Sequence, residues 1–326
     1  MRFHGLMVVR DEEDILPQTL THILTWCDAL YVYDLGSTDR TWEIVNDFAN
    51  RDARIVPYAR RPTIYTEGLR AILFDKYRDR FERGDWILKV DGDEFYEIPP
   101  PRFASEKVRP HESRVDLLWY FFRLTSREVR EYHSDEQILT DRMRPIQLRR
   151  RFYKVASYAE PRMFRYRPGM QWSPQLSWPF NAGFVARERI PIRHYPHRDP
   201  LQMQRRYRLR AGMCALGASA GPHWNLEDWR KDVVDVDSSP SGQREATANE
   251  GLAAAPGHTD GELRQWMPGT PLPEFHFTNH IPPFRTRLLQ RALYATAVGL
   301  FDARRPKYPD SFEPAYIDDA TNATLG

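Results

Sequence analysis

Two aspartates that follow a strand-like apolar run are the residues whose types and spacing first indicate chemistry. Asp91-Gly92-Asp93-Glu94 comes directly after Trp86-Ile87-Leu88-Lys89-Val90. Carboxylate oxygens are the ligands that Mg²⁺ prefers, and a cation held by them can neutralise the charge of a diphosphate. In an extended chain Asp91 and Asp93 point to the same side. Their position after a strand favours this interpretation over a solvated acidic turn.

Two other strand-like runs also end in an aspartate. Asp11 comes shortly after Leu6-Met7-Val8-Val9, and Asp34 follows Ala29-Leu30-Tyr31-Val32-Tyr33. A carboxylate at a strand end can accept hydrogen bonds from the ribose or base of a nucleotide, and the start of a following helix favours polar or anionic groups. Local helix capping is the alternative for this turn, and it explains Asp39 well.

The elements that must position these acids alternate between strand and helix. Apolar periodicity predicts strands at residues 6–9, 29–33, 54–58 and 86–90, and helices that begin near residue 16 and span 42–49 and 67–81. Such alternation is typical of a parallel sheet with right-handed crossovers, whose ligands bind at the carboxyl ends of the strands. We therefore predict an α/β fold, a Rossmann-like, mixed but mainly parallel sheet flanked by helices, with Asp11, Asp34 and Asp91 at one edge.

The remainder of the chain has a different pattern. It predicts strands at 117–122, 146–148 and 192–195, a helix over 201–218 and a last helix over 286–301. We divide the chain into a domain of residues 1–199, which holds the acids, and a helical C-terminal region of residues 200–326. Residues 237–273 are rich in Ser, Gly, Ala and Pro without periodicity, so we predict a flexible segment there.

Composition narrows the class of protein. The 326 residues include 47 Lys and Arg against 45 Asp and Glu, so the global charge gives no indication of a nucleic-acid partner. Cys27 and Cys214 lie far apart, which favours a reducing, cytoplasmic location over a disulfide framework. Residues 1–5 enter a strand at once, unlike a signal peptide, and the apolar runs are too short to span a membrane.

Three segments together resemble the successive signatures of family 2 glycosyltransferases, in the same order and with similar spacing. They are Val9 to Leu16, Asp34 to Thr41 and Asp85 to Phe95. The resemblance covers about the first third of the chain. It implies the A-type nucleotide-sugar-binding fold, transfer of a sugar with inversion, and Mg²⁺ or Mn²⁺ as cofactor. One departure is Asp11, because the family commonly has asparagine at this position.

The resemblance also implies roles for single residues. Asp11 and Asp34 line the nucleotide pocket, with Glu12 near it. Asp93 contacts the metal, and Asp91 lies near the ribose or the metal. Arg70 resembles the family's donor-contacting arginine and would meet the diphosphate, whereas a solvated helix arginine is the alternative.

A later segment is similar to the His-Tyr-x-x-Arg segment of some bacterial members. It runs from Arg193 to Asp199 and precedes an arginine-rich helix. His194 is a candidate nitrogen ligand of the metal, and Arg198 is a candidate contact of the diphosphate, with Arg205 and Arg206 adding positive charge. A structural histidine is the alternative for His194.

Inversion requires a base, because the acceptor hydroxyl must lose its proton as it attacks. Family members often supply an acid well after the metal motif, but the matching region here, Trp172 to Trp178, contains none. The candidates are Glu160, Glu188 and Asp199, and the sequence leaves the choice among them open.

These observations predict a metal-dependent, inverting glycosyltransferase that moves a sugar from a nucleotide-diphosphate sugar to a glycan or lipid-linked acceptor, in cell-surface glycan synthesis. A non-catalytic nucleotide-sugar or carbohydrate-binding relative is the main alternative, because no base is evident. A methyltransferase would use the strand end at Val32 to Gly36, but further glycines are missing. A nucleotidyltransferase would need a glycine-rich loop after the first strand, where this chain has acids.

The predicted last helix bears on location. Its apolar stripe, flanked by Arg285, Arg287 and Arg291, is compatible with peripheral contact at the inner face of the plasma membrane. A helix docked on the protein explains the same stripe. The stripe consists of Leu288, Leu289, Ala292, Leu293 and Leu300.

Overall fold

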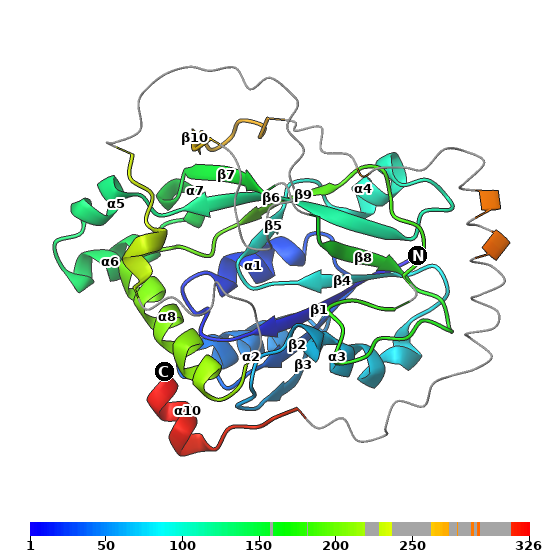
Figure 1. Ribbon diagram of the computed structural model, residues 1–326, viewed down its shortest axis with the longest axis horizontal. Helices are drawn as coiled ribbons and strands as arrows, with labels where there is room; N and C mark the ends of the chain where they lie inside the picture. Colours follow the sequence, from blue (N-terminus) through cyan, green and yellow to red (C-terminus); the bar gives the residue numbers. More distant parts are fainter. Residues whose placement is uncertain are drawn as a thin grey trace.

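The fold is built on one mixed sheet (Figure 1). The computed structural model describes residues 1–156, 159–180, 182–218, 228–236, 262–273, 279, 288–289, 292–293 and 314–326. Within these residues the sheet has ten strands, of which eight follow the order β10-β7-β6-β8-β4-β1-β2-β3, and β9 and β5 extend it beside β6. The predicted α/β class, with a mixed sheet flanked by helices, is confirmed.

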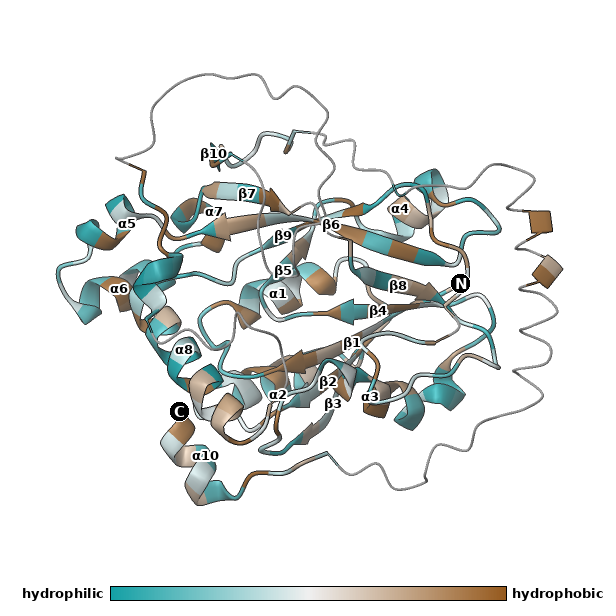
Figure 2. Ribbon diagram, in the orientation of Figure 1, coloured by the Kyte–Doolittle hydropathy of each residue, from teal (hydrophilic) through white to brown (hydrophobic). Residues whose placement is uncertain are grey.

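The first half of the chain forms the parallel part of the sheet. Its strands are β1 (Phe3–Val9), β2 (Ala29–Asp34), β3 (Ile55–Arg60) and β4 (Trp86–Val90). β1 lies between β2 and β4, with Val9 opposite Asp34 and Met7 opposite Val90. β1 and β4 are buried along their whole length, which is why they read as continuous apolar runs in the sequence. Figure 2 shows this hydrophobic centre beside the mainly hydrophilic helices α5 and α6.

Helices cover both faces of the parallel strands. Apolar residues of α1 (Leu16–Ile23) and α2 (Thr41–Arg51) pack in one cluster with Met7 and Val9, while α3 (Arg70–Lys76) packs in a second cluster with Leu6 and Val8. The single helix predicted over 67–81 is wrong in its continuity, because 3-10 turns at Glu67–Leu69 and Arg78–Arg80 flank α3. Gly68 lies against Pro174, where a Cβ would come within 1.8 Å of the proline carbonyl oxygen.

The second half of the sheet is mainly antiparallel and is organised around one long strand. β6 (Arg114–Arg123) pairs with β8 (Pro161–Arg165), β7 (Phe152–Ala156) and β9 (Ile190–His194), and β9 pairs in turn with β5 (Glu94–Tyr96). The β5-β9 register sets Glu94 opposite His194. This pairing brings the segment after β4 against a strand from about a hundred residues later in the chain.

The strand predicted at residues 146–148 is wrong. Residues 146–148 form the short helix α7 (Ile146–Arg149), which begins after Pro145, a residue suited to start a helix rather than a central strand. Residues 262–273, at the end of the segment predicted to be flexible, include β10 (Arg264–Gln265), which pairs with β7, and the buried Trp266. Residues 237–261 lie outside the described residues.

The remaining helices lie around the sheet. They are α4 (Pro100–Lys107), α5 (Ser126–Glu131), α6 (Asp135–Arg142), α8 (Pro200–Ala215) and α10 (Asp319–Leu325). Figure 1 shows α8 passing the carboxyl ends of β1 and β4, with α10 beside it. Most of the predicted last helix lies outside the described residues, although its Leu288, Leu289 and Leu293 are exposed. In the described part of the chain, no helix has the length and apolar character needed to span a membrane.

Candidate active site

A cavity of about 250 Å³ lies at the carboxyl ends of β1 and β4. Its walls come from both halves of the sheet and from α8. Of the residues that the sequence singled out, those that line it are Glu12, Arg70, Asp91, Asp93, Glu160, His194 and Arg206. The strand-end motif, the arginine of α3 and the histidine of β9 therefore lie around one cavity.

Two arginines hold Asp91. Arg70 contacts Oδ1 of Asp91, and Nη2 of Arg162 donates to Oδ2 over 2.7 Å. Arg70 is 2% exposed and also donates to the backbone carbonyls of Leu6 and Val90, which fixes it beneath the strand ends. Burial by itself would raise the pKa of Asp91, but the two guanidinium groups outweigh burial and lower this pKa well below its usual range. Asp91 is thus a fixed anion in the cavity wall.

Asp93 faces a second group of cations. His194 Nε2 lies 3.4 Å from Oδ1 of Asp93, and Arg206 Nη1 donates to Oδ2 over 3.1 Å. Burial acts to raise the pKa of Asp93, yet the nearby His194, Arg206 and Arg198 lower it well below the usual value. The His194 ring packs between Trp119 and Phe121, with ring centroids 4.8 and 4.9 Å away. The aromatic contacts fix the ring so that its Nε2 atom faces Asp93.

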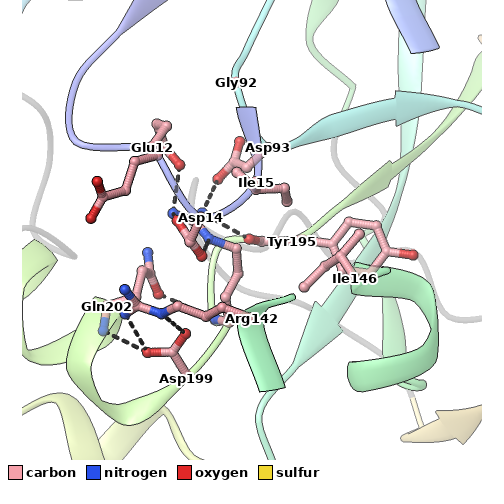
Figure 3. A network of polar contacts seen from close by, with 12 residues as sticks. Glu12, Asp14, Ile15, Gly92, Asp93, Arg142, Ile146, Tyr195, Asp199 and Gln202 are labelled. Atoms are coloured by element: carbon pink, nitrogen blue, oxygen red, sulfur yellow. Dashed lines mark hydrogen bonds and ion pairs between the residues drawn. The ribbon is translucent and has the colours of Figure 1, made fainter. Parts of the chain in front are cut away.

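A buried ion network lies behind Asp93 (Figure 3). Arg198 donates to both carboxylate oxygens of Asp14, over 2.7 and 3.0 Å, and lies 2.5 Å from Oε2 of Glu12. Burial raises the pKa of Glu12 to about 8, with Arg198 acting in the opposite direction. Arg198 is not among the described residues that line the cavity. This geometry therefore does not favour the predicted contact between Arg198 and the diphosphate. Asp14, which the sequence analysis did not single out, is its main partner.

Asp11 and Asp34 hold the turn that follows β2. Oδ1 of Asp34 accepts hydrogen bonds from the backbone N–H groups of Gly36 and Ser37, at 2.8 and 2.6 Å. Burial raises the pKa of Asp34 to about 6, and its Oδ2 has no hydrogen-bond partner among the described residues. Asp11 has a φ of 55° and accepts from the Thr38 N–H over 2.7 Å.

The residues that line the large cavity at this point are the sequence neighbours of Asp11 and Asp34, and not these two aspartates themselves. Arg10 and Leu35 line it, whereas Asp11 lines a smaller neighbouring cavity of about 40 Å³. The two cavities share Arg10, Glu12, Arg206 and Leu209. Asp11 and Asp34 therefore act first as organisers of the turn, which is the local role that the sequence analysis gave only to Asp39.

The structure separates the three candidate bases. Glu160 lines the cavity, contacts Lys89 and lies 3.7 Å from Arg162. Glu188 is 44% exposed and pairs only loosely with Arg187. Asp199 is fully buried and caps α8 by accepting from the Gln202 N–H over 2.9 Å, while two arginines hold its oxygens. Glu188 and Asp199 do not line the cavity within the described residues, so Glu160 is the candidate that we retain.

The sequence analysis did not identify several residues that lie in or beside the cavity. Arg162 of β8 contacts Asp91 and Glu94, and the Trp119 indole N–H donates to Glu94 over 2.8 Å. Burial raises the pKa of Glu94 well above its usual value, against the opposing effect of Arg162. Lys89 is a fully buried charge within β4. For Lys89 the available signal was a lone charge within an apolar strand, since such a charge is rarely buried without a partner.

The donor set can be compared with the needs of a divalent cation. Among the described residues, no three His, Cys, Asp or Glu side chains converge on a common point suited to a metal ion. Asp93 and His194 do present an oxygen and a nitrogen 3.4 Å apart beside the cavity. Mg²⁺ often takes only one or two side-chain ligands and completes its shell with substrate phosphates and water. The pair therefore fits a cation that is recruited together with a phosphate-bearing substrate.

Comparisons with known proteins give limited similarity. No protein-family model matches the sequence. A TPR repeat-containing protein of Synechococcus elongatus is 33% identical over 98 residues, which span 27% of this chain and 19% of that protein. The chain thus covers about a fifth of the length of this curated relative.

Three solved structures are similar over larger parts of the chain. Residues 1–349 of Staphylococcus aureus TarS match with a TM-score of 0.30 at 11% identity, covering 69% of this chain and 68% of that one. The mannosyltransferase PcManGT of Pyrobaculum calidifontis, in complex with GDP-Man and Mn²⁺, gives 0.34 at 10%, covering 68% and 66%. GalNAc-T7 with UDP, GalNAc and Mn²⁺ gives 0.30 at 11%, covering 71% and 54%.

Proposed function

We propose that this protein is a glycosyltransferase that moves a sugar from a nucleotide-diphosphate sugar to an acceptor hydroxyl. The observation that carries the proposal is the meeting of Asp91, Asp93, Arg70 and His194 in one cavity at the carboxyl ends of β1 and β4. This edge is where open α/β sheets bind their ligands. The resemblance of the three strand-end motifs to family 2 supports the same activity.

The charges around the cavity suit a nucleoside diphosphate. Arg206 and Arg210 of α8 line it opposite the strand ends, and Arg206 lies within hydrogen-bonding distance of Asp93. Guanidinium groups bind phosphate oxygens with two donors at once. Because Asp93 and Arg206 both face the cavity, the pair can open to admit a cation on the carboxylate and a phosphate on the arginine.

In this proposal Asp93 and His194 would hold Mg²⁺ or Mn²⁺. The cation supplies positive charge that stabilises the departing diphosphate. Asp91 is kept ionised and immobile by Arg70 and Arg162, and it orients the ribose by accepting hydrogen bonds from the ribose hydroxyl groups. The turn held by Asp11 and Asp34 supports the nucleotide end of the cavity through Arg10 and Leu35.

Glu160 is the proposed base. An inverting reaction needs a carboxylate that accepts the acceptor's proton as the new glycosidic bond forms. Burial would raise the pKa of Glu160, but Lys89 and Arg162 outweigh it and lower the pKa, so the side chain is ionised at neutral pH. The acceptor, which we propose is a glycan or a lipid-linked sugar in cell-surface synthesis, would approach from this side of the cavity.

Glu160→Gln should reduce kcat by about a hundredfold to ten-thousandfold, the usual contribution of a general base. Donor affinity should change little, since the substitution keeps the size of the side chain. Initial rates and donor Kd measured on the same preparation separate the two effects. Glu188→Gln, at an exposed site outside the cavity, is the matched comparison and should keep the wild-type rate. A Glu160→Gln variant with full kcat would remove Glu160 from the mechanism.

Thermal shift with UDP-, GDP- and dTDP-sugars, each with and without Mn²⁺, tests the function directly. A ligand that binds only the native state at a hundred times its Kd stabilises it by about 2.7 kcal/mol. We expect one nucleotide class to raise Tm, with a larger rise when Mn²⁺ is present. If no nucleotide sugar changes Tm, the proposal is wrong. Release of free sugar from a labelled donor then distinguishes an enzyme from a non-catalytic binder, which should release none.

A further inference from the structure

The turn after β2 is held by side chains from widely separated parts of the chain. Three carbonyl groups of this turn, those of Leu35, Gly36 and Ser37, each accept a hydrogen bond from a different side chain. The donors are Arg10 Nη1 at 3.0 Å, Asn322 Nδ2 at 3.1 Å and Arg60 Nη2 at 2.5 Å, in that order. Asp34 and Asp11 accept from the N–H groups of residues 36–38. The conformation of this turn is therefore imposed by its surroundings.

Asn322 is the most distant of these partners in sequence. It lies on α10 and is 8% exposed. While its Nδ2 donates to the Gly36 carbonyl, its Oδ1 accepts a hydrogen bond from Nη2 of Arg10 over 2.8 Å. Arg10 lines the large cavity, and so does Leu35, the residue before Gly36. The buried Asn322 amide therefore connects α10 to one residue of the cavity wall and to the direct neighbour of another.

The segment that carries Asn322 is itself anchored at several points. We call residues 314–326 the clasp. Its Ala315 carbonyl accepts from the Ile64 N–H over 2.8 Å, and its Ile317 N–H donates to the Pro62 carbonyl over 3.0 Å. At its other end Leu325 packs against α8 at Gly212, where a Cβ would lie 2.1 Å from the leucine Cδ2 atom. The clasp thus bridges the segment after β3 and the helix that carries Arg206.

We propose that Asn322 is a positioning residue of the donor site, through which the clasp fixes Arg10 and the turn of residues 35–38 in the geometry that receives the nucleotide. The inference rests on the proposed function for the identity of the ligand. Asn is suited to this task because one amide can donate to a carbonyl and accept from a guanidinium at the same time. An aspartate could keep only the bond from Arg10.

Hydrogen–deuterium exchange tests the clasp without any ligand. In the full chain, Asn322→Ala should speed amide exchange of residues 36–38 by about tenfold, because the loss of one hydrogen bond to a charged group and one to the backbone frees the turn. Asn322→Asp should give an intermediate rate. Thr324→Ala is the control, because Thr324 is exposed on the same helix and bonds only to the Thr321 carbonyl in the described contacts. Unchanged exchange in Asn322→Ala would overturn the inference.

Calorimetric titration with UDP and with GDP, in the presence of Mg²⁺, tests the link to the donor site. For the nucleotide that binds the wild type, Asn322→Ala should raise Kd by about tenfold. At saturating donor, kcat should stay near the wild-type value, which separates positioning from catalysis. Faster exchange with unchanged Kd would overturn the role in the donor site. If the wild type binds neither nucleotide, the proposed function fails in its donor, and the donor-site role of Asn322 fails with it, while the exchange result still decides whether the clasp holds the turn.

Discussion

Asp93→Asn is expected to reduce turnover by about a thousandfold or more, because it removes the charge that would bind the cation at the leaving diphosphate. Asp93 is the strand-end carboxylate that faces both His194 and Arg206 in the cavity. Asparagine keeps the size of the side chain and an oxygen that can accept from Arg206. The fold should therefore persist, with a cost in stability of about 1–3 kcal/mol from weakened charged hydrogen bonds.

Steady-state kinetics and urea unfolding of the same variant distinguish loss of chemistry from loss of fold. Asp75→Asn is the matched control, because Asp75 is 46% exposed and pairs with Arg78 on the surface. Turnover of the wild type should also fall with EDTA and return with Mn²⁺. Turnover of Asp93→Asn close to the wild type, or full wild-type activity with chelator present, would exclude Asp93 as the ligand of a required cation.

The position of the site was predictable because it depends on a general property of parallel sheets. Each βαβ unit returns the chain in the same direction, so acids that follow separate apolar strands must share one edge. The β1-β2 register, with Val9 opposite Asp34, confirms this for the first two strands, and the β1-β4 pairing brings Asp91 to the same edge. Asp34 nevertheless turns its carboxylate to its own backbone, a local choice that strand periodicity does not determine.

The other wall of the cavity could not be predicted in the same way. Trp119, Arg162 and His194 come from β6, β8 and β9. β6 pairs with β8 in the antiparallel and with β9 in the parallel direction, and both pairings depend on contacts between distant segments. Among them, only His194 carried a sequence signal, through its resemblance to a family segment. Glu160 was one of three candidate acids of similar rank. Glu160 could be chosen only from the three-dimensional structure, in which it lines the cavity and contacts Lys89.

Arg198 has buried partners that the sequence did not indicate. The sequence placed it beside His194 and predicted a contact with the diphosphate. In the structure its guanidinium is fully buried, bonds both oxygens of Asp14 and contacts Glu12. Composition gives no indication of this pairing, because the two partners are 184 residues apart. The interaction joins the loop after β1 to the start of α8, and so fixes the helix that carries Arg206.

Arg198→Met should therefore lower the free energy of unfolding by about 3–5 kcal/mol, because it leaves the buried Asp14 carboxylate without its main cation. Burial raises the pKa of Glu12 to about 8, so this group can lose its counterion by taking up a proton, and Asp14 accounts for most of the expected loss. Urea unfolding at neutral pH measures the change. Donor affinity of the variant, measured at a temperature where it remains folded, should fall much less than in Arg206→Met.

Two further variants test whether the loss in the free energy of unfolding comes from breaking this buried ion pair or would follow the removal of any arginine. Arg102→Met removes a partner of Glu106 from an exposed helix surface and should cost less than about 1 kcal/mol. Combining Arg198→Met with Asp14→Asn removes both members of the main pair and should recover at least half of the loss, since an amide is far less costly to bury than a carboxylate. If the double variant is less stable than Arg198→Met by the full cost of a second independent substitution, the two residues are not coupled. Arg198 would then be free to serve the donor, as its place in the sequence first indicated.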